Sequence, residues 1–169
     1  MDLKLIPHIK EECHRIEEDS LYSSKSHYNT ASCWEKRNLW IGIPTTVLAA
    51  IAGISALESY TWFTVGTSVL VAVLSALNTF LNPSEKANQH KASASAYNTL
   101  KNNVRVFREI ELLKENITTD EISEQLKNYS DTRNQLNSTS PSIPLWAYKK
   151  TQEDINNNYA TYKVDKEKQ

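Results

Sequence analysis

The stretch Leu39-Trp-Ile-Gly-Ile-Pro-Thr-Thr-Val-Leu-Ala-Ala-Ile-Ala-Gly-Ile-Ser-Ala-Leu57 decides the fold. It holds no charged residue, and it has the length of the roughly 20 apolar residues that a helix needs to cross a bilayer core. A second uncharged run extends from Tyr60 to about Leu81, and only Glu58 and Ser59 separate the two. So short a linker predicts two antiparallel helices that satisfy their backbone hydrogen bonds internally. We therefore predict an all-α membrane protein with a transmembrane helical hairpin, its spans at about 39–57 and 60–81.

A buried helical hairpin in a soluble bundle is the alternative. The mean hydropathy of −0.53 resembles that of a soluble protein, but the charge is uneven, because Glu58 is the only charged residue between Arg37 and Glu85. A soluble domain of this size seldom buries two helices on all faces, which favours the membrane. The net charge of −1 offers no basic field for nucleic acid, so we expect no nucleic-acid partner.

Lysine and arginine predict the orientation of the hairpin. Lys36 and Arg37 precede the first span, Lys86 and Lys91 follow the second, and the loop between the spans has neither residue type. The positive-inside rule then places both termini in the cytoplasm, as in a multi-pass protein of the cell inner membrane. We accordingly expect an N-terminal cytoplasmic helix over residues 1–38, the hairpin over 39–82 and a cytoplasmic helical region over 83–169, the cytoplasmic helices together forming a bundle.

A polar stripe follows one face of the second span. Its members recur at steps of three and four residues, interrupted only at Val71: Thr61, Thr64, Ser68, Ser75, Asn78 and Asn82. A polar face in a bilayer is expected to meet a partner helix or water rather than lipid. The stripe therefore predicts either a pore lining or oligomer contact, or hydrogen bonds between the two helices of one hairpin.

Small residues recur four apart in both spans. The helix-packing candidates are Ala49 and Gly53 in the first span, and Ala72 and Ala76 in the second. Such pairs allow helix backbones to approach closely in a membrane, although alanine-rich composition alone produces the same spacing.

The regions flanking the hairpin read as further helices. Leu5, Ile9, Cys13 and Ile16 share a helical face before the first span. After the second span, Asn82-Pro83-Ser84-Glu85 is typical of a helix start, with Asn82 as the cap. A cytoplasmic packing stripe typical of a coiled coil then follows, and it should pack on the N-terminal helix or on a neighbouring protomer: Tyr97, Leu100, Val104 and Phe107.

The C-terminal third carries a capping box and an apolar segment. Thr118-Thr-Asp-Glu121 predicts the start of a helix that ends in a loop beginning at Asn137. The segment from Pro141 to Lys150, with Trp146 and Tyr148, could rest on lipid headgroups or pack on the helical bundle.

The chemistry of known enzymes is missing from the sequence. With three glycines, all inside the spans, no loop that cradles phosphate is expected, and there is neither an HExxH nor a GxSxG motif. The spacing of His8, Cys13, His14 and His27 matches no zinc pattern. We expect no enzymatic activity, no catalytic residue, no metal and no cofactor.

Several loose motifs follow one another in a fixed order over about residues 15 to 160: Tyr28-xx-Ala31-xx-Trp34, Ile43-Pro44-Thr-Thr-Val-Leu-Ala49, Leu74-Ser-Ala-Leu77-xx-Phe80-Leu-x-Pro83, His90-x-Ala92 to Tyr97-xx-Leu100, and Ser140-Pro141-x-Ile143-Pro144-x-Trp146-Ala147. Together these motifs resemble those of the SLATT-domain proteins, small prokaryotic membrane effectors with two transmembrane helices.

The resemblance implies a pore-forming effector of an anti-phage conflict system. The resemblance further implies that such proteins oligomerise and permeabilise the inner membrane when a sensor signals infection, which leads to growth arrest or death. The partners implied are the lipid bilayer, further copies of the chain, and a separate sensor or nucleotide-signalling protein. The alternative is a non-conducting membrane anchor that recruits a cytoplasmic partner through the packing stripe.

Overall fold

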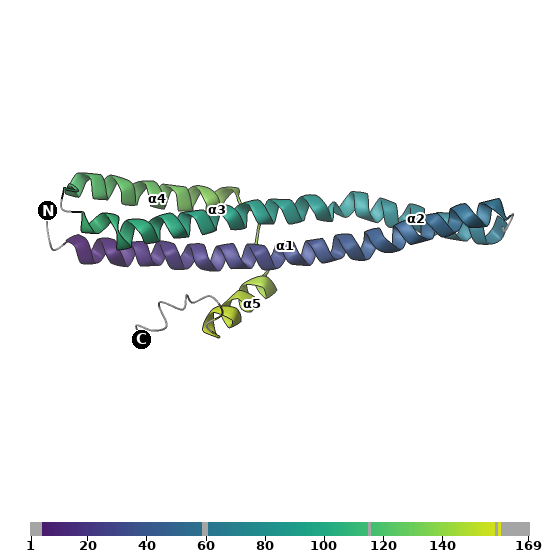
Figure 1. Ribbon diagram of the computed structural model, residues 1–169, viewed down its shortest axis with the longest axis horizontal. Coiled ribbons are helices and arrows are strands. Elements are labelled where there is room, and N and C mark those ends of the chain that lie inside the picture. Colours follow the sequence, from purple (N-terminus) through teal and green to yellow (C-terminus); the bar gives the residue numbers. More distant parts are fainter. Residues whose placement is uncertain (1–4, 59–60, 115, 158, 160–169) are drawn as a thin grey trace. The chain divides into compact units, whose positions relative to one another are not determined.

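The computed structural model describes residues 5–58, 61–114, 116–157 and 159. Within this part the regular structure is entirely helical: α1 (Leu5–Leu57), α2 (Thr61–Leu81), α3 (Pro83–Glu109), the 3₁₀-helix η1 (Glu111–Leu113), α4 (Thr119–Thr139) and α5 (Leu145–Asn156) (Figure 1). The predicted all-α class is confirmed. Tyr60, which the sequence placed at the start of the second span, lies outside the described residues.

The chain divides into two compact units. The bundle unit comprises Met1–Thr30 and Gln89–Gln169, and the hairpin unit comprises Ala31–Asn88. Both α1 and α3 contribute residues to each unit.

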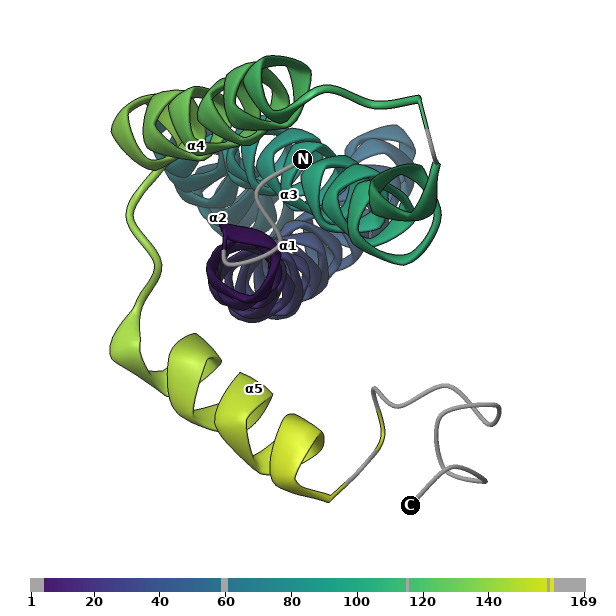
Figure 2. The same cartoon turned by 90° about the vertical axis from the view of Figure 1, so that its left-hand side faces the viewer.

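The bundle unit is built on the N-terminal part of α1. In the end view of Figure 2, α4 and α5 lie on different sides of this part of α1, and α3 runs beside it. A hydrophobic core joins these helices, and its buried members are Ile9, Cys13 and Ile16 from α1, Leu100, Val104 and Phe107 from α3, Leu112 from η1 and Ile122 from α4. The predicted apolar face of the N-terminal helix therefore packs inside this unit.

The ends of α4 follow from local chemistry. Thr118 accepts a hydrogen bond from the Glu121 amide, and the Glu121 carboxylate accepts one from the Thr118 amide, so the predicted capping box is confirmed. The prediction that the loop begins at Asn137 was wrong, because the helix continues to Thr139. The hydroxyls of Ser138 and Thr139 donate to the carbonyl of Gln135, which helps these loop-forming residues to remain helical.

Helix α5 packs on the bundle rather than standing free. Ala147 and Thr151 are fully buried, and the Tyr148 ring lies 5.8 Å from that of Tyr22 on α1. Of the two readings of this segment, the contacts favour packing on the bundle. Leu145 and Trp146 stay exposed on its outer side.

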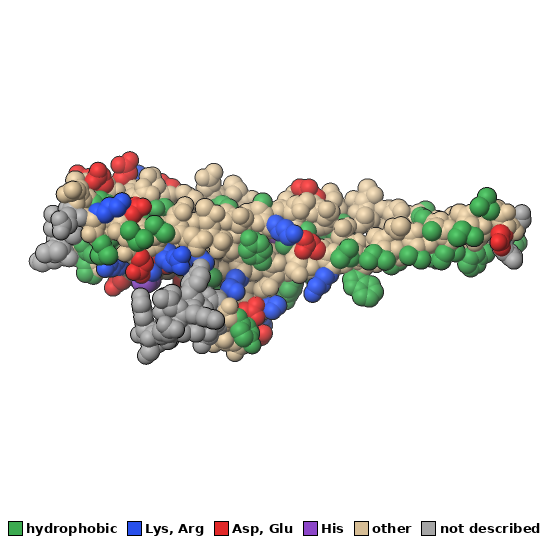
Figure 3. Space-filling model, viewed as in Figure 1, with side chains coloured by type: hydrophobic (Ala, Val, Ile, Leu, Met, Phe, Trp, Pro, Cys, Tyr) green, Lys and Arg blue, Asp and Glu red, His purple; other side chains and the backbone are tan. Residues whose placement is uncertain are grey.

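The hairpin unit carries its large apolar side chains on the outside. Trp40, Ile54, Trp62 and Phe80 are all exposed, and Figure 3 shows hydrophobic side chains spread along the hairpin. Exposed apolar surface on this scale is not stable in water and requires lipid or protein to cover it. Both α1 and the helical stretch that begins at Thr61 contain a segment long and apolar enough to cross a membrane.

Candidate functional site

The contact between the two helices of the hairpin is a narrow seam. Its residues are buried or half-buried and recur at steps of three and four: Ile41, Thr45, Leu48, Ala52 and Ser55 on α1, and Thr64, Thr67, Val71, Leu74, Asn78 and Leu81 on α2. This spacing is that of a coiled-coil seam between antiparallel helices. The other spanning residues that the structure describes are exposed, apart from Gly42.

Most hydroxyls in the seam bond to their own helix. Thr45 donates to the carbonyl of Ile41 at 2.7 Å, Ser55 to that of Ile51 at 2.8 Å, and Thr67 to that of Phe63 at 2.9 Å. These bonds let hydroxyls sit between the helices without partners on the other helix.

Two polar atoms in the seam lack such a bond. The Oγ1 atom of Thr64 and the Oδ1 atom of Asn78 are buried, and neither has a hydrogen-bond partner among the described residues. A buried acceptor without a partner destabilises the arrangement that buries it by about 1–3 kcal/mol. These two oxygens, one near each end of α2, therefore destabilise the packing of α2 against α1.

The predicted polar stripe divides between two surfaces. Thr64 and Asn78 point into the seam, whereas Thr61, Ser68, Ser75 and Asn82 are exposed. Sequence reasoning missed Thr67, which is buried, because the stripe was traced through its neighbour Ser68. Steps of four and three residues, counted backward and forward from Val71, lead to Thr67 and Leu74. A stripe traced through Val71 would therefore have included these two residues.

The predicted small residues lie outside the contact between α1 and α2. Ala49, Gly53, Ala72 and Ala76 are all exposed. A Cβ atom built on Gly53 meets nothing within 4 Å. Their role in helix packing stays a prediction.

Exposed small and polar residues gather on one flank of the hairpin. With 3.6 residues per turn, Ala49 and Gly53 lie roughly a quarter turn beyond the seam of α1, and Ser68 and Ser75 lie roughly a quarter turn beyond the seam of α2. Because the helices are antiparallel, the two quarter turns fall on the same side. We call this surface the small flank; its members are Thr46, Ala49 and Gly53 on α1, and Thr61, Ser68, Ala72, Ser75 and Thr79 on α2.

Asn82 has a separate role at the break between α2 and α3. It adopts a left-handed backbone conformation with φ 42°, which asparagine tolerates better than most residues. Its amide donates to the Asn78 carbonyl, ending α2, and its carbonyl accepts from the Lys86 amide, starting α3. Pro83 follows and has no amide hydrogen to leave unsatisfied.

A family model matches nearly all of this chain. The model is described as SMODS and SLOG-associating 2TM effector domain family 4, and it matches residues 8–167. The chain belongs to this family. The resemblance to SLATT-domain proteins is thus confirmed, as is the fold class, a membrane protein with a two-helix transmembrane hairpin. No curated protein matches the chain, and no solved structure matches it.

The effector domain holds its packing stripe inside the bundle unit. Tyr97, Leu100, Val104 and Phe107 are at most 3% exposed. Of the two expected contacts, the structure places the stripe against the N-terminal part of α1, in one chain. The anchor hypothesis cannot use these four residues as a recruiting surface, because they form the core.

Buried polar residues form a second layer in the bundle unit. The Nδ1 atoms of His27 and His90 are 2.8 Å apart, so one ring donates and the other accepts. Ser24 donates to the Ala94 carbonyl at 2.8 Å, and Ser26 donates to Thr151 at 3.0 Å. Burial and the neighbouring His90 lower the pKa of His27 to about 4, and burial also lowers the pKa of His90.

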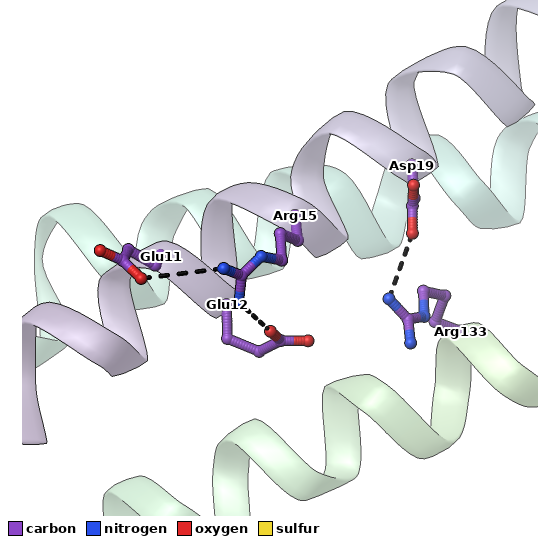
Figure 4. Close-up of polar contacts among 5 residues, drawn as sticks. All are labelled: Glu11, Glu12, Arg15, Asp19 and Arg133. Carbon is purple, nitrogen blue, oxygen red and sulfur yellow. Dashed lines mark hydrogen bonds and ion pairs between the residues drawn. The ribbon is translucent and has the colours of Figure 1, made fainter.

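Ion pairs connect the helices outside this layer. The Arg108 guanidinium donates twice to the Glu17 carboxylate, at 2.7 and 3.1 Å, and this pair is largely buried. Arg133 on α4 reaches Asp19 on α1 at 3.1 Å, whereas Arg15 pairs within α1 (Figure 4). Among the described residues, no three His, Cys, Asp or Glu side chains gather as metal ligands would.

Proposed function

We propose that the chain is a non-enzymatic membrane effector of a bacterial conflict or anti-phage system. In this proposal several copies associate in the inner membrane, with their termini in the cytoplasm, and permeabilise it when a separate sensor or nucleotide-signalling protein provides the signal. Membership of a family described as an effector domain supports the effector class. One hairpin of two helices cannot enclose an aqueous path, so conduction requires further copies.

The small flank is the observation that carries this proposal. It places exposed polar side chains such as Ser68 and Ser75 beside exposed small residues such as Ala49 and Gly53. Small residues permit close helix packing in lipid, and polar residues gain by facing another helix or water. The remaining faces carry bulky apolar residues suited to lipid.

Two glycines allow a matched test of the flank. Gly53 lies on the small flank, whereas Gly66 lies on the other side of the α2 seam; at both, an added Cβ meets nothing within 4 Å. Both Gly53→Leu and Gly66→Leu should therefore leave the single hairpin intact. We expect Gly53→Leu alone to reduce the oligomer mass in detergent and the dye leakage from liposomes that contain the purified protein. Equal behaviour of the two variants, in either direction, would refute the assignment of the flank.

The lining of the pore is tested by apolar substitutions along the predicted stripe. We expect Ser75→Leu to reduce ion flux, since its side chain is exposed on the small flank. Asn78 lies in the seam, so it can line a water path only if the seam opens. Asn78→Leu should then reduce flux by holding the seam closed, and unchanged flux in both variants would exclude the stripe as the lining.

A different surface supports the alternative function, that of a non-conducting membrane anchor. Three apolar residues are exposed here: Val106 near the C-terminal end of α3, Ile110 between α3 and η1, and Leu113 in η1. A soluble partner of apolar complementary surface could cover them. Under this alternative, the double variant Ile110→Asp with Leu113→Asp loses effector activity in cells. Liposomes that contain the unaltered protein show no leakage.

A further inference from the structure

Three cations lie where the first span begins and where α3 starts. Arg37 sits 4.6 Å from the centroid of the Trp34 ring, and Lys86, from the first turns of α3, sits 4.5 Å from the same centroid. Lys36 is exposed. Cation–π contacts hold two of these charges in place.

Two carboxylates lie close to these cations in the sequence. Glu35 and Glu85 are the acidic residues next to this cluster, and each takes part in an interaction within the chain. On the helical wheel of α1, Glu35 lies on the far side of Lys36 from Arg37, because successive residues are about 100° apart. The carboxylate of Glu35 therefore does not lie on the face of α1 that carries Arg37.

An apolar groove begins one turn further along α1. Leu39, Trp40, Ile43 and Pro44 line a groove of about 240 Å³ within the hairpin unit. Residues three and four apart are neighbours on a helix, so Lys36 stands above Leu39 and Trp40, and Arg37 stands above Trp40. The cations thus lie at the end of the groove nearest the start of the span.

Pro44 deprives one backbone carbonyl at this groove of its usual helical hydrogen bond. Pro44 lies inside α1 and has no amide hydrogen, so the Trp40 carbonyl receives no bond from residue 44. The neighbouring Thr45 hydroxyl is bonded to the Ile41 carbonyl instead. A hydroxyl of a lipid headgroup or glycerol backbone would satisfy the Trp40 carbonyl.

We propose that Lys36, Arg37 and the groove from Leu39 to Pro44 bind one anionic phospholipid of the leaflet at the open end of the hairpin. Its phosphate lies between the Lys36 and Arg37 side chains, Lys86 adds charge from α3, and one acyl chain fills the groove. The cations match an anionic headgroup and the groove matches a hydrocarbon chain, so the two halves of the site share one occupant. The inference rests on the transmembrane placement of the hairpin in the proposed function and is independent of conduction.

Lipid retention provides the test. The protein is reconstituted in nanodiscs that contain phosphatidylglycerol and phosphatidylcholine, extracted into mild detergent, and the bound lipids are counted by native mass spectrometry. We expect phosphatidylglycerol to be retained over phosphatidylcholine. Each cation near an anionic surface changes affinity about fivefold, so Lys36→Gln with Arg37→Gln should weaken retention about 25-fold.

Matched variants separate this site from general electrostatics. Lys114→Gln with Lys127→Gln removes the same charge from exposed positions of the bundle unit and should leave retention unchanged. Ile43→Trp fills the groove without changing charge and should also release the lipid. Circular dichroism and the melting temperature of each variant confirm that the helices remain folded.

Three outcomes would overturn the proposal. Equal retention of the two lipids would show that the cations do not select the headgroup. Displacement of phosphatidylglycerol by millimolar inorganic phosphate would indicate a site for free anions rather than lipid. An equal loss in the bundle control would attribute retention to net charge. Leakage is measured separately, so a protein that conducts but shows no lipid preference refutes this site alone.

Discussion

Acidification should destabilise the bundle unit through the buried His27–His90 pair. Both rings are less than 10% exposed, their Nδ1 atoms are 2.8 Å apart, and Tyr97 stacks on His27 at 5.7 Å between centroids. Protonation of His27 would remove the acceptor in this pair or place a cation against the His90 N–H. The folded state therefore resists protonation, and the pKa of His27 falls from 6.5 to about 4.

The direction of the effect follows from linkage. At pH values above 6.5 the His27 ring is neutral in both the folded and the unfolded chain, so its contribution to stability is complete. As the pH falls from 6.5 to about 4, the unfolded chain binds a proton that the folded chain does not, and stability is lost. At pH 5 the loss from His27 is about 2 kcal/mol, and the lowered pKa of His90 acts in the same direction.

Unfolding by denaturant in mild detergent between pH 5 and 8 measures this loss. His27→Gln keeps an amide that can pair with His90 but does not titrate, so it should reduce the dependence of unfolding free energy on pH to the part that His90 contributes. His14→Gln is the control, because His14 is exposed on the same helix. The reasoning is refuted if His27→Gln and the unaltered protein lose the same stability between pH 7 and pH 5, or if the His27 ring titrates near pH 6.5 by NMR.

Three further predictions concern stability. Phe107→Ala should lower the unfolding free energy by about 3–5 kcal/mol because Phe107 is fully buried, whereas Val106→Ala, at an exposed neighbour, should change it little; denaturant midpoints compare them. Thr118→Ala should cost about 1 kcal/mol by removing the capping box of α4, with Ser123→Ala as the control, and an equal loss in both would contradict the cap. Asn78→Leu should stabilise the closed hairpin by about 1 kcal/mol, because it removes a buried acceptor that has no partner; steric trapping of the hairpin in bicelles measures this, and a destabilised hairpin would show that Asn78 has a partner in the membrane.

The large elements of the fold were predictable because they depend on strong, local signals. An uncharged run such as Leu39–Leu57 predicts a span by length alone, and the Thr118–Glu121 pair fixes the start of α4 by its own hydrogen bonds. The face of Ile9, Cys13 and Ile16 and the face of Leu100, Val104 and Phe107 were each recognisable from spacing, and the structure packs one against the other.

The details of the candidate site were less predictable because periodicity gives a face but not its partner. Thr64 and Ser68 share a polar face in sequence, but Thr64 lies in the seam and Ser68 on the small flank. Serine and threonine satisfy their hydroxyls on their own helix, so polarity alone does not distinguish the surface that meets α1 from the one left open. The His27–His90 pair was missed for another reason: the two residues lie on different helices, and only their packing joins them.

The seam and the small flank together suggest how one hairpin could serve a resting and an active state. The closed seam buries the Thr64 and Asn78 oxygens without partners, which makes it less stable than an apolar seam of the same shape. The small flank offers, just beside it, a surface on which further helices could pack closely. A modest free energy gained there on assembly would then offset the cost of opening the seam, and the two oxygens would meet water or a neighbouring helix. This coupling predicts opposite effects for two substitutions: Asn78→Leu favours the closed hairpin and Gly53→Leu blocks the flank, so both should reduce leakage, but only Gly53→Leu should reduce oligomer mass.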